Sequence, residues 1–239
     1  MIMEQAERPI VGLVTGNSRG SVNAEQEFHQ QLAGLVDVAT TRIPLYRISY
    51  GDLDKMIDNL PGAAEMLTDS GASIIVWNSV SGSSLHGQET ANLLEQRVGV
   101  PVLLPSIEFV NSLRELGARR IALVTPHGVE LSLLEKIFFD RNDIEVRKVI
   151  HLVENTGGDV FKIDKVTGAD VLAEVQKRNF DDVDAVVFDS PTCSIYAIAR
   201  ELEAHTGRPL LPHNQILMRS ALRRLGLPTD RIFIDAYFH

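Results

Sequence analysis

Short apolar runs alternate with helical patterns along nearly the whole chain. The predicted strands cover residues 9–15, 36–45, 72–77, 101–104, 120–125, 144–152, 185–188, 210–211 and 232–234. The predicted helices cover residues 23–35, 52–70, 88–98, 106–116, 130–139, 169–178, 195–204 and 215–225, and the second of them is interrupted at Pro61-Gly62. Residues 154–164 are predicted to form a surface loop. This alternation indicates an α/β fold with mostly parallel sheets.

Two of the apolar runs look like copies of each other. Residues 74–79 (IIVWNS) and 186–190 (VVFDS) are both short, rich in β-branched residues, and end at a polar residue followed by serine. Such runs are typical of strands buried on both faces of a parallel sheet. The predicted fold therefore has two lobes related by a pseudo-twofold axis. Each lobe is a mostly parallel sheet flanked by helices, and the active site lies in the cleft between them.

The strand and helix pattern starts again just after Gly117. This restart favours two equivalent lobes over one long sheet. We expect residues 1–116 together with residues 214–239 to form the first lobe, and residues 117–213 to form the second.

The paired strand ends carry the first candidate residues. Ligands of open α/β sheets bind just past the carboxyl ends of the strands, so Ser79 and Ser190 are expected to face each other across the cleft. The Ser/Gly-rich segment 78–84 offers backbone N–H groups and hydroxyls to an anion, and it equally suits a loop whose serines cap a helix. A second segment, 15–20, contains G-x-x-x-G and no dinucleotide or phosphate-loop motif. Its Asn17 and Ser18 could bind a carboxylate.

Histidine and cysteine are the side chains here that could move a proton or attack a substrate. His127 directly follows a predicted strand, so it is a candidate general acid or base, or simply a loop histidine in solvent. His213 and Asn214 occupy a similar place after a later strand. Cys193 lies past its strand end, where a lone thiol is more typical of packing than of catalysis.

Charge and composition exclude several functions. The formal charge of −9 argues against nucleic acid, since phosphate binding needs a basic face. No Cys/His spacing resembles a metal site, no apolar run is long enough to span a bilayer, and residues 1–8 lack a signal-peptide core. The single cysteine allows no intramolecular disulfide. We expect a cytoplasmic homo-oligomer, a dimer or tetramer, that binds neither nucleic acid nor membrane.

Three segments resemble the aspartate/glutamate racemase superfamily, and most closely its branch of maleate cis–trans isomerases and arylmalonate decarboxylases. Residues 79–83 with Gly87 are similar to the branch's C-T-S-G-S…G loop. Residues 113–127 (LRELGARRIALVTPH) are similar to its L-R-x-L-G-x-x-R-I-A-L-V-T-P-Y signature. Residues 190–215 resemble its second cysteine loop and S-N-Q motif, which here reads His213-Asn214-Gln215.

The resemblance implies cofactor-independent chemistry on a small mono- or dicarboxylate, with no metal. It also implies that serine stands at both cysteine positions, Ser79 and Ser190, and that histidine replaces the signature tyrosine at His127. A serine hydroxyl is not ionised without a base, so proton shuttling between two unassisted serines is implausible.

The expected catalytic residues are His127, Ser79 and Ser190. The expected substrate-binding residues are Asn17, Ser18, Asn78, Val80, Ser81, Ser83, Pro191, Thr192, His213 and Asn214. Three functions stay open: a decarboxylase or isomerase in the manner of the branch, a hydrolase in which His127 activates a serine, and a non-catalytic carboxylate-binding protein. The hydrolase requires His127 within hydrogen-bond reach of Ser79 or Ser190.

Overall fold

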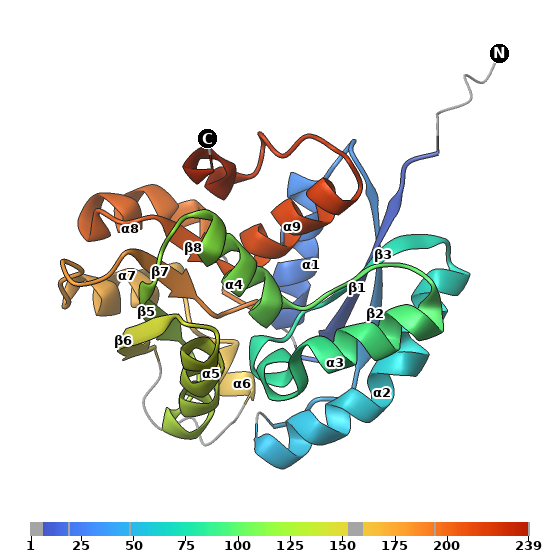
Figure 1. Ribbon diagram of the computed structural model, residues 1–239, viewed down its shortest axis with the longest axis horizontal. Coiled ribbons are helices and arrows are strands. Elements are labelled where there is room, and N and C mark those ends of the chain that lie inside the picture. The colour runs from blue at the N-terminus through green and yellow to red at the C-terminus, as the bar shows by residue number, and fades with distance from the viewer. Residues whose placement is uncertain (1–6, 19, 48, 153–159, 194, 239) are drawn as a thin grey trace.

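The first half of the chain alternates strand and helix. Its elements are β1 (Ile10–Gly16), α1 (Gly20–Gln31), β2 (Asp37–Ile43), α2 (Tyr50–Asp69), β3 (Ala72–Trp77), α3 (Val80–Val98), β4 (Val102–Leu103) and α4 (Pro105–Glu115). Figure 1 displays them in blue to green. The structure is a computed structural model, and it describes residues 7–18, 20–47, 49–152, 160–193 and 195–238.

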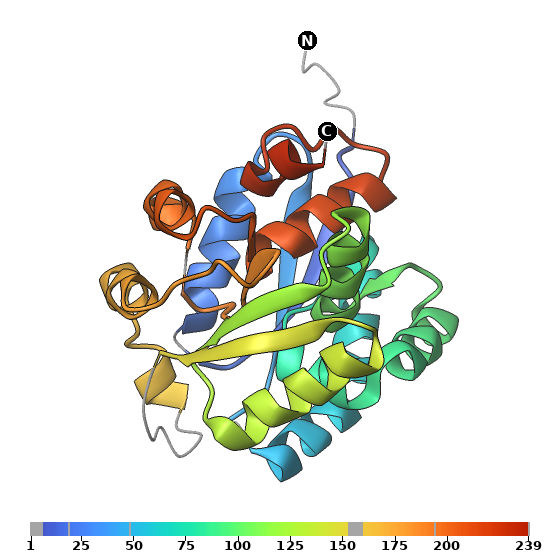
Figure 2. The same cartoon turned by 60° about the vertical axis from the view of Figure 1, so that its left-hand side comes forward.

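The second half repeats the alternation with more irregular connections. Its elements are β5 (Arg120–Thr125), α5 (Val129–Arg141), β6 (Glu145–His151), α6 (Val160–Ile163), α7 (Gly168–Gln176), β7 (Ala185–Phe188), η1 (Tyr196–Ile198), α8 (Ala199–Thr206), β8 (Leu210–Pro212), α9 (His213–Arg224) and η2 (Phe233–Tyr237). Figures 1 and 2 both show α7 and α8 side by side at the outer side of this half.

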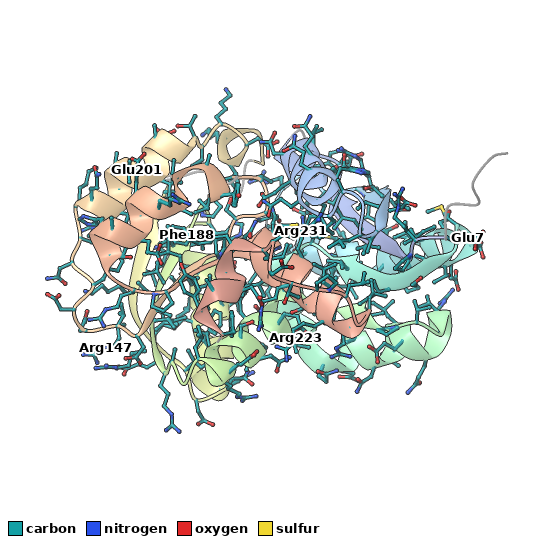
Figure 3. All side chains as sticks on the ribbon, turned by 90° about the horizontal axis from the view of Figure 1, so that it is seen from above. Glu7, Arg147, Phe188, Glu201, Arg223 and Arg231 are labelled. Atoms are coloured by element: carbon teal, nitrogen blue, oxygen red, sulfur yellow. The ribbon has the colours of Figure 1, made fainter. Side chains whose placement is uncertain are left out.

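Two four-stranded parallel sheets confirm the predicted α/β fold. Their strand orders are β2-β1-β3-β4 and β6-β5-β7-β8, so the same topology occurs twice. The register is also equivalent, because Trp77 pairs with Val14 as Phe188 pairs with Val124. Phe188 is almost fully buried, and Figure 3 places it inside the second half, well away from Arg147 and Glu201 at the periphery.

Ser79 and Ser190 lie at equivalent positions, as the repeat predicts. The Ser79 hydroxyl accepts a hydrogen bond from the backbone N–H of Gly82 at 3.3 Å. The Ser190 hydroxyl accepts one from the N–H of Cys193 at 3.2 Å. Both serines therefore satisfy a backbone N–H at the start of the segment that follows their strand.

The halves are packed together by helices. α5 of the second half contacts α3 of the first, and α9 leaves β8 to pack against α4 and α1 (Figure 1). The assignment of residues 214–239 to the first lobe and 117–213 to the second stays a prediction.

Two predicted elements are wrong, and a third is confirmed but incomplete. α2 runs through Pro61 without interruption, since its buried face of Leu53, Leu60 and Leu67 packs as one stripe. The predicted helix at 88–98 is confirmed as the second part of α3, which is also helical from Val80 up to a non-helical break at Gly87 (φ 49°). Residues 232–234 form no strand: η2 packs its fully buried Ile234 against α9 instead.

The predicted loop at 154–164 is only partly described. Residues 153–159 lie outside the described residues, and Val160–Ile163 form the short helix α6.

Candidate active site

A cavity of about 570 Å³, including its open mouth, lies where strands of both sheets end. It is reached by Gly16 at the end of β1, Asn78 after β3, His127 after β5 and Asp189 after β7. The carboxyl ends of parallel strands are where open α/β folds bind ligands. Both halves therefore contribute to one site, as the sequence predicts.

The first turn of α3 supplies hydrogen-bond donors to the cavity. Ser79, Val80 and Ser81 all line it, and Ser79 is the N-cap of α3, whose first part ends at the non-helical Gly87. The first N–H groups of a helix have no intrahelical partner and carry partial positive charge, so they favour an anion. This end of the cavity suits a carboxylate.

His127 is held firmly between β5 and α5. Its backbone N–H donates to the Thr125 hydroxyl at 3.2 Å, and its carbonyl oxygen lies 2.7 Å from Nδ1 of His151. The side chain is buried, 7% exposed, yet it lines the cavity. Fixing both sides of the backbone fixes the direction of the imidazole ring.

Two fully buried carboxyl groups face His127. Its Nε2 lies 3.3 Å from Oδ2 of Asp189 and 3.9 Å from Oε1 of Glu135. The Glu135 oxygen also accepts a hydrogen bond from the Ser81 hydroxyl at 2.5 Å. Glu135 therefore ties α5 of the second half to the first turn of α3.

The two carboxyl groups divide the charge between them. Burial, together with the nearby charge of Asp189, raises the pKa of Glu135 well above its usual value and so favours its protonated form. Burial alone would also raise the pKa of Asp189, but its interactions with His127 and then His213 outweigh burial and lower that pKa. Asp189 is thus the ionised member of the pair.

His213 links Asp189 to the other half. Its Nδ1 lies 3.5 Å from Oδ1 of Asp189, and its Nε2 lies 2.5 Å from the side-chain oxygen of Asn78. Asn78 and Asp189 occupy equivalent strand ends, because their N–H groups donate to Val14 and Val124 respectively, each at 2.9 Å. His213 therefore connects the two equivalent residues of the repeat, because it contacts both Asn78 and Asp189.

His127, Glu135 and Asp189 could also hold a divalent cation, since one ligand atom of each lies within 4.8 Å of the others. A proton shared within the same group is the alternative to a metal: the pKa of Glu135 is raised, the pKa of Asp189 is lowered, and Asp189 lies between two imidazoles. The Ser81 hydroxyl donates a hydrogen bond to Glu135, and this contact alone lowers the pKa of Glu135, although burial and the charge of Asp189 outweigh it. The assay below tests the two alternatives with a chelator.

The structure brings most of the predicted site residues to the cavity. Those that line it are Ser18, Asn78, Ser79, Val80, Ser81, His127, Pro191 and Thr192. The other five predicted residues, Asn17, Ser83, Ser190, His213 and Asn214, are not among the described residues that line it.

These five make structural contacts instead. Asn17 accepts a hydrogen bond from the Leu45 N–H, and the Ser83 hydroxyl donates to the carbonyl of Val80. Asn214 donates to the buried carboxylate of Glu27. Among the described hydrogen bonds none joins His127 to Ser79 or Ser190, so the contact that a serine hydrolase needs is not formed.

Cys193 contributes no ready nucleophile. It is buried, and burial, together with the charges of Asp170 and Glu27, raises the pKa of its thiol to about 11. It is also absent from the described residues that line the cavity. A thiol in this state is mostly un-ionised and inert.

Sequence reasoning missed Glu135, Asp189 and Asp164. A signal existed for Glu135, because it lies between Leu131 and Phe139 at helical spacing on the buried face of α5. Asp189 could have been found as the repeat equivalent of Asn78. Asp164 follows α6, a helix that the sequence did not predict, and it lines the cavity with Ile163.

A family model for arylmalonate decarboxylase matches residues 11–232, almost the whole chain. The chain belongs to the arylmalonate decarboxylase family. It is also 24% identical over 201 residues to a maleate isomerase of Alcaligenes faecalis, a match covering 80% of this chain and 78% of that protein.

Solved structures related to this family member share its fold. The maleate isomerase Iso of Pseudomonas putida S16 is 18% identical, with a TM-score of 0.84 over 93% of this chain and 94% of that one. A mutant of the Nocardia farcinica maleate cis–trans isomerase, which holds a covalently bound succinylcysteine intermediate, is 20% identical. Its TM-score is 0.84, over 92% of this chain and 94% of that one.

Proposed function

We propose that this member of the arylmalonate decarboxylase family is a cofactor-independent enzyme that acts on a small carboxylate. The observation that carries the proposal is His127. It lines the cavity with one ring nitrogen beside ionised Asp189, while the first turn of α3 offers donors for a carboxylate. This places a group that can move a proton in the same cavity as a site that suits an anion.

Within that class, the site favours decarboxylation and protonation over addition of a thiol. The Nocardia relative carries a covalent succinylcysteine, whereas the one thiol here, Cys193, is buried and holds its proton tightly. In the proposed reaction a C–C bond breaks and CO₂ leaves. The electron pair is delocalised into the neighbouring carbonyl group, whose developing charge the α3 N–H groups stabilise. His127 then delivers a proton to carbon.

The buried acids have separate roles in this reaction. Ionised Asp189 orients the His127 ring and stabilises its cationic form, as a carboxylate behind a catalytic imidazole does. Protonated Glu135 keeps a second negative charge away from His127 and holds Ser81 in place through their hydrogen bond.

The test is an NMR assay in D₂O with malonates, maleate, hydroxy acids and their half-amides, which reports both loss of CO₂ and deuterium at the adjacent carbon. We expect His127→Phe to lower kcat by about 10²–10⁴-fold, which is the usual rate enhancement from general acid–base catalysis. His29→Phe, on the exposed side of α1, is the matched control and should be unaffected.

Each alternative gives a distinct result in that assay. A loss in KM alone would mean that His127 only binds the carboxylate as a cation. Inactivation by a chelator would mean that His127, Glu135 and Asp189 bind a metal ion that the activity requires. Binding without turnover of any substrate would make the protein a carboxylate-binding relative. If the protein is an active enzyme, Cys193→Ala should leave its activity within a few-fold of the wild-type value.

We further propose a cytoplasmic homo-oligomer. Val129, Leu133 and Ile137 form an exposed apolar stripe at four-residue spacing along α5, with 73%, 52% and 39% of their surfaces accessible. Such a stripe supports association between copies. Among the described residues, no helix combines the length and apolarity that crossing a membrane demands.

A further inference from the structure

The cavity is acidic. Among the described residues that line it, Asp164 and Asp189 are carboxylates and none is lysine or arginine. Asp189 lies beside His127 and His213, at 3.3 Å and 3.5 Å respectively. Asp164 lines the cavity and forms no ion pair with any described residue.

Asp164 occupies the start of α1. Its Oδ1 accepts a hydrogen bond from the Ser18 hydroxyl at 3.2 Å, while its Oδ2 is buried and has no partner. The packing is close, since a Cβ added to Gly20, the first residue of α1, would lie only 2.2 Å from Oδ1. The helix end that would attract a ligand's anion is therefore already filled by a carboxylate of the chain.

The two ends of the cavity consequently prefer different groups. The start of α3, at Ser79, Val80 and Ser81, has donors and no acidic side chain among these three residues. The other end has the carboxylate of Asp164, whose Oδ2 is buried without a hydrogen-bond partner, a costly state for an acceptor. A second ligand carboxylate placed there would meet a like charge.

We propose that Asp164 sets the substrate class: a monocarboxylate whose other end presents an N–H donor, a carboxamide or an ammonium group, with dicarboxylates disfavoured. This inference rests on the proposed function, since it assumes that a substrate carboxylate binds at the start of α3.

Calorimetry with matched ligand pairs tests the proposal. Maleate is compared with its half-amide, malonate with its half-amide, and β-alanine represents the ammonium ligands. We expect the wild-type protein to bind the half-amides or β-alanine at least tenfold more tightly than the dicarboxylates. Asp164→Asn should reverse this order, because an asparagine side chain can donate to a second carboxylate. Asp181→Asn removes the same charge at an exposed site and should change neither affinity.

The possible outcomes separate the two proposals. If dicarboxylates bind the wild-type protein as tightly as the half-amides, the role of Asp164 is overturned while the proposed carboxylate site stands. If no carboxylate of either kind binds, the proposed function itself fails. If Asp164→Asn does not fold, the comparison of ligands on the wild-type protein still tests the role of Asp164. The difference in affinity between half-amides and dicarboxylates should then become smaller with added salt, because salt screens like-charge repulsion.

Discussion

At the scale of single residues, the unusual feature is a protonated glutamic acid beside an ionised aspartate in the interior. Glu135 and Asp189 are both fully buried, and their environments move their pKa values in opposite directions. Pairs of carboxyl groups held in different charge states are typical of sites that handle protons. The sequence predicted His127 from its place after a strand, but not its acidic partners. Burial and neighbouring charge decide their states, and both depend on contacts between residues far apart in the chain.

The raised pKa of Glu135 predicts how stability depends on pH. In the folded protein Glu135 keeps its proton above the pH at which the unfolded chain loses it, near 4.5. The folded state then binds more protons, so the free energy of unfolding falls as pH rises through this range, by up to about 1.4 kcal/mol per pH unit. Glu135→Gln should flatten this slope above about pH 4.5 in urea unfolding.

The control for this variant is Glu130→Gln, an exposed position on the same helix, which should keep the wild-type slope. The prediction is contradicted if the free energy of unfolding changes with pH in the same way for the wild-type protein and for Glu135→Gln. That result would mean that Glu135 is ionised in the folded protein.

At the scale of elements, the start of α1 is the most tightly constrained segment of the site. A Cβ at Gly20 would lie 2.2 Å from Oδ1 of Asp164 and 2.5 Å from the Cβ of Thr192. Both neighbours belong to the second half of the chain and line the cavity. We expect Gly20→Ala to destabilise the protein by about 1–3 kcal/mol through overpacking and to weaken ligand binding. Chemical denaturation and calorimetry measure the two effects.

Gly62→Ala is the matched control, because nothing lies within 4 Å of a Cβ added there in the middle of α2. Alanine is the better helix former by about 1 kcal/mol, so this variant should be more stable than the wild-type protein. If Gly20→Ala were stabilised in the same way, α6 and the loop after β7 would not pack against α1 as described.

Most elements could be predicted from periodicity, and the exceptions share one cause. Pro61 and the Ser/Gly-rich start of α3 have poor local helix propensity, yet both segments are helical: α2 buries an apolar face, and residues 80–83 at the start of α3 are buried. The run at 232–234 has strand-like composition, yet its backbone packs against α9. In each case tertiary packing outweighs local preference, and a single sequence carries no direct record of packing.

At the scale of the whole molecule, the repeat predicted the two sheets and the shared cavity, whereas the contacts that join the halves were not predicted. One such junction centres on Glu27 of α1, which is 7% exposed. Its carboxylate accepts hydrogen bonds from Asn214 and Gln215 at the start of α9, each at 2.9 Å. Asn214 also donates to the carbonyl of Pro191 in the loop after β7. This junction connects a helix of the first half to the end of the last strand of the second.

We expect Glu27→Ala to lower the free energy of unfolding by about 1–3 kcal/mol, since it removes a charged acceptor from buried amide donors. Gln26→Ala, one residue away on the exposed face of α1, should stay within about 0.5 kcal/mol of the wild-type protein. Because Glu27 joins both halves, the variant should also lose ligand affinity, although Glu27 lies outside the cavity lining.

Urea unfolding followed by both tryptophan fluorescence and circular dichroism makes the measurement. The single tryptophan, Trp77, lies in β3 of the first half, so coincident transitions would mean that the halves unfold as one unit. A stable Glu27→Ala protein with unchanged affinity would show that α9 is held to α1 by its apolar contacts alone.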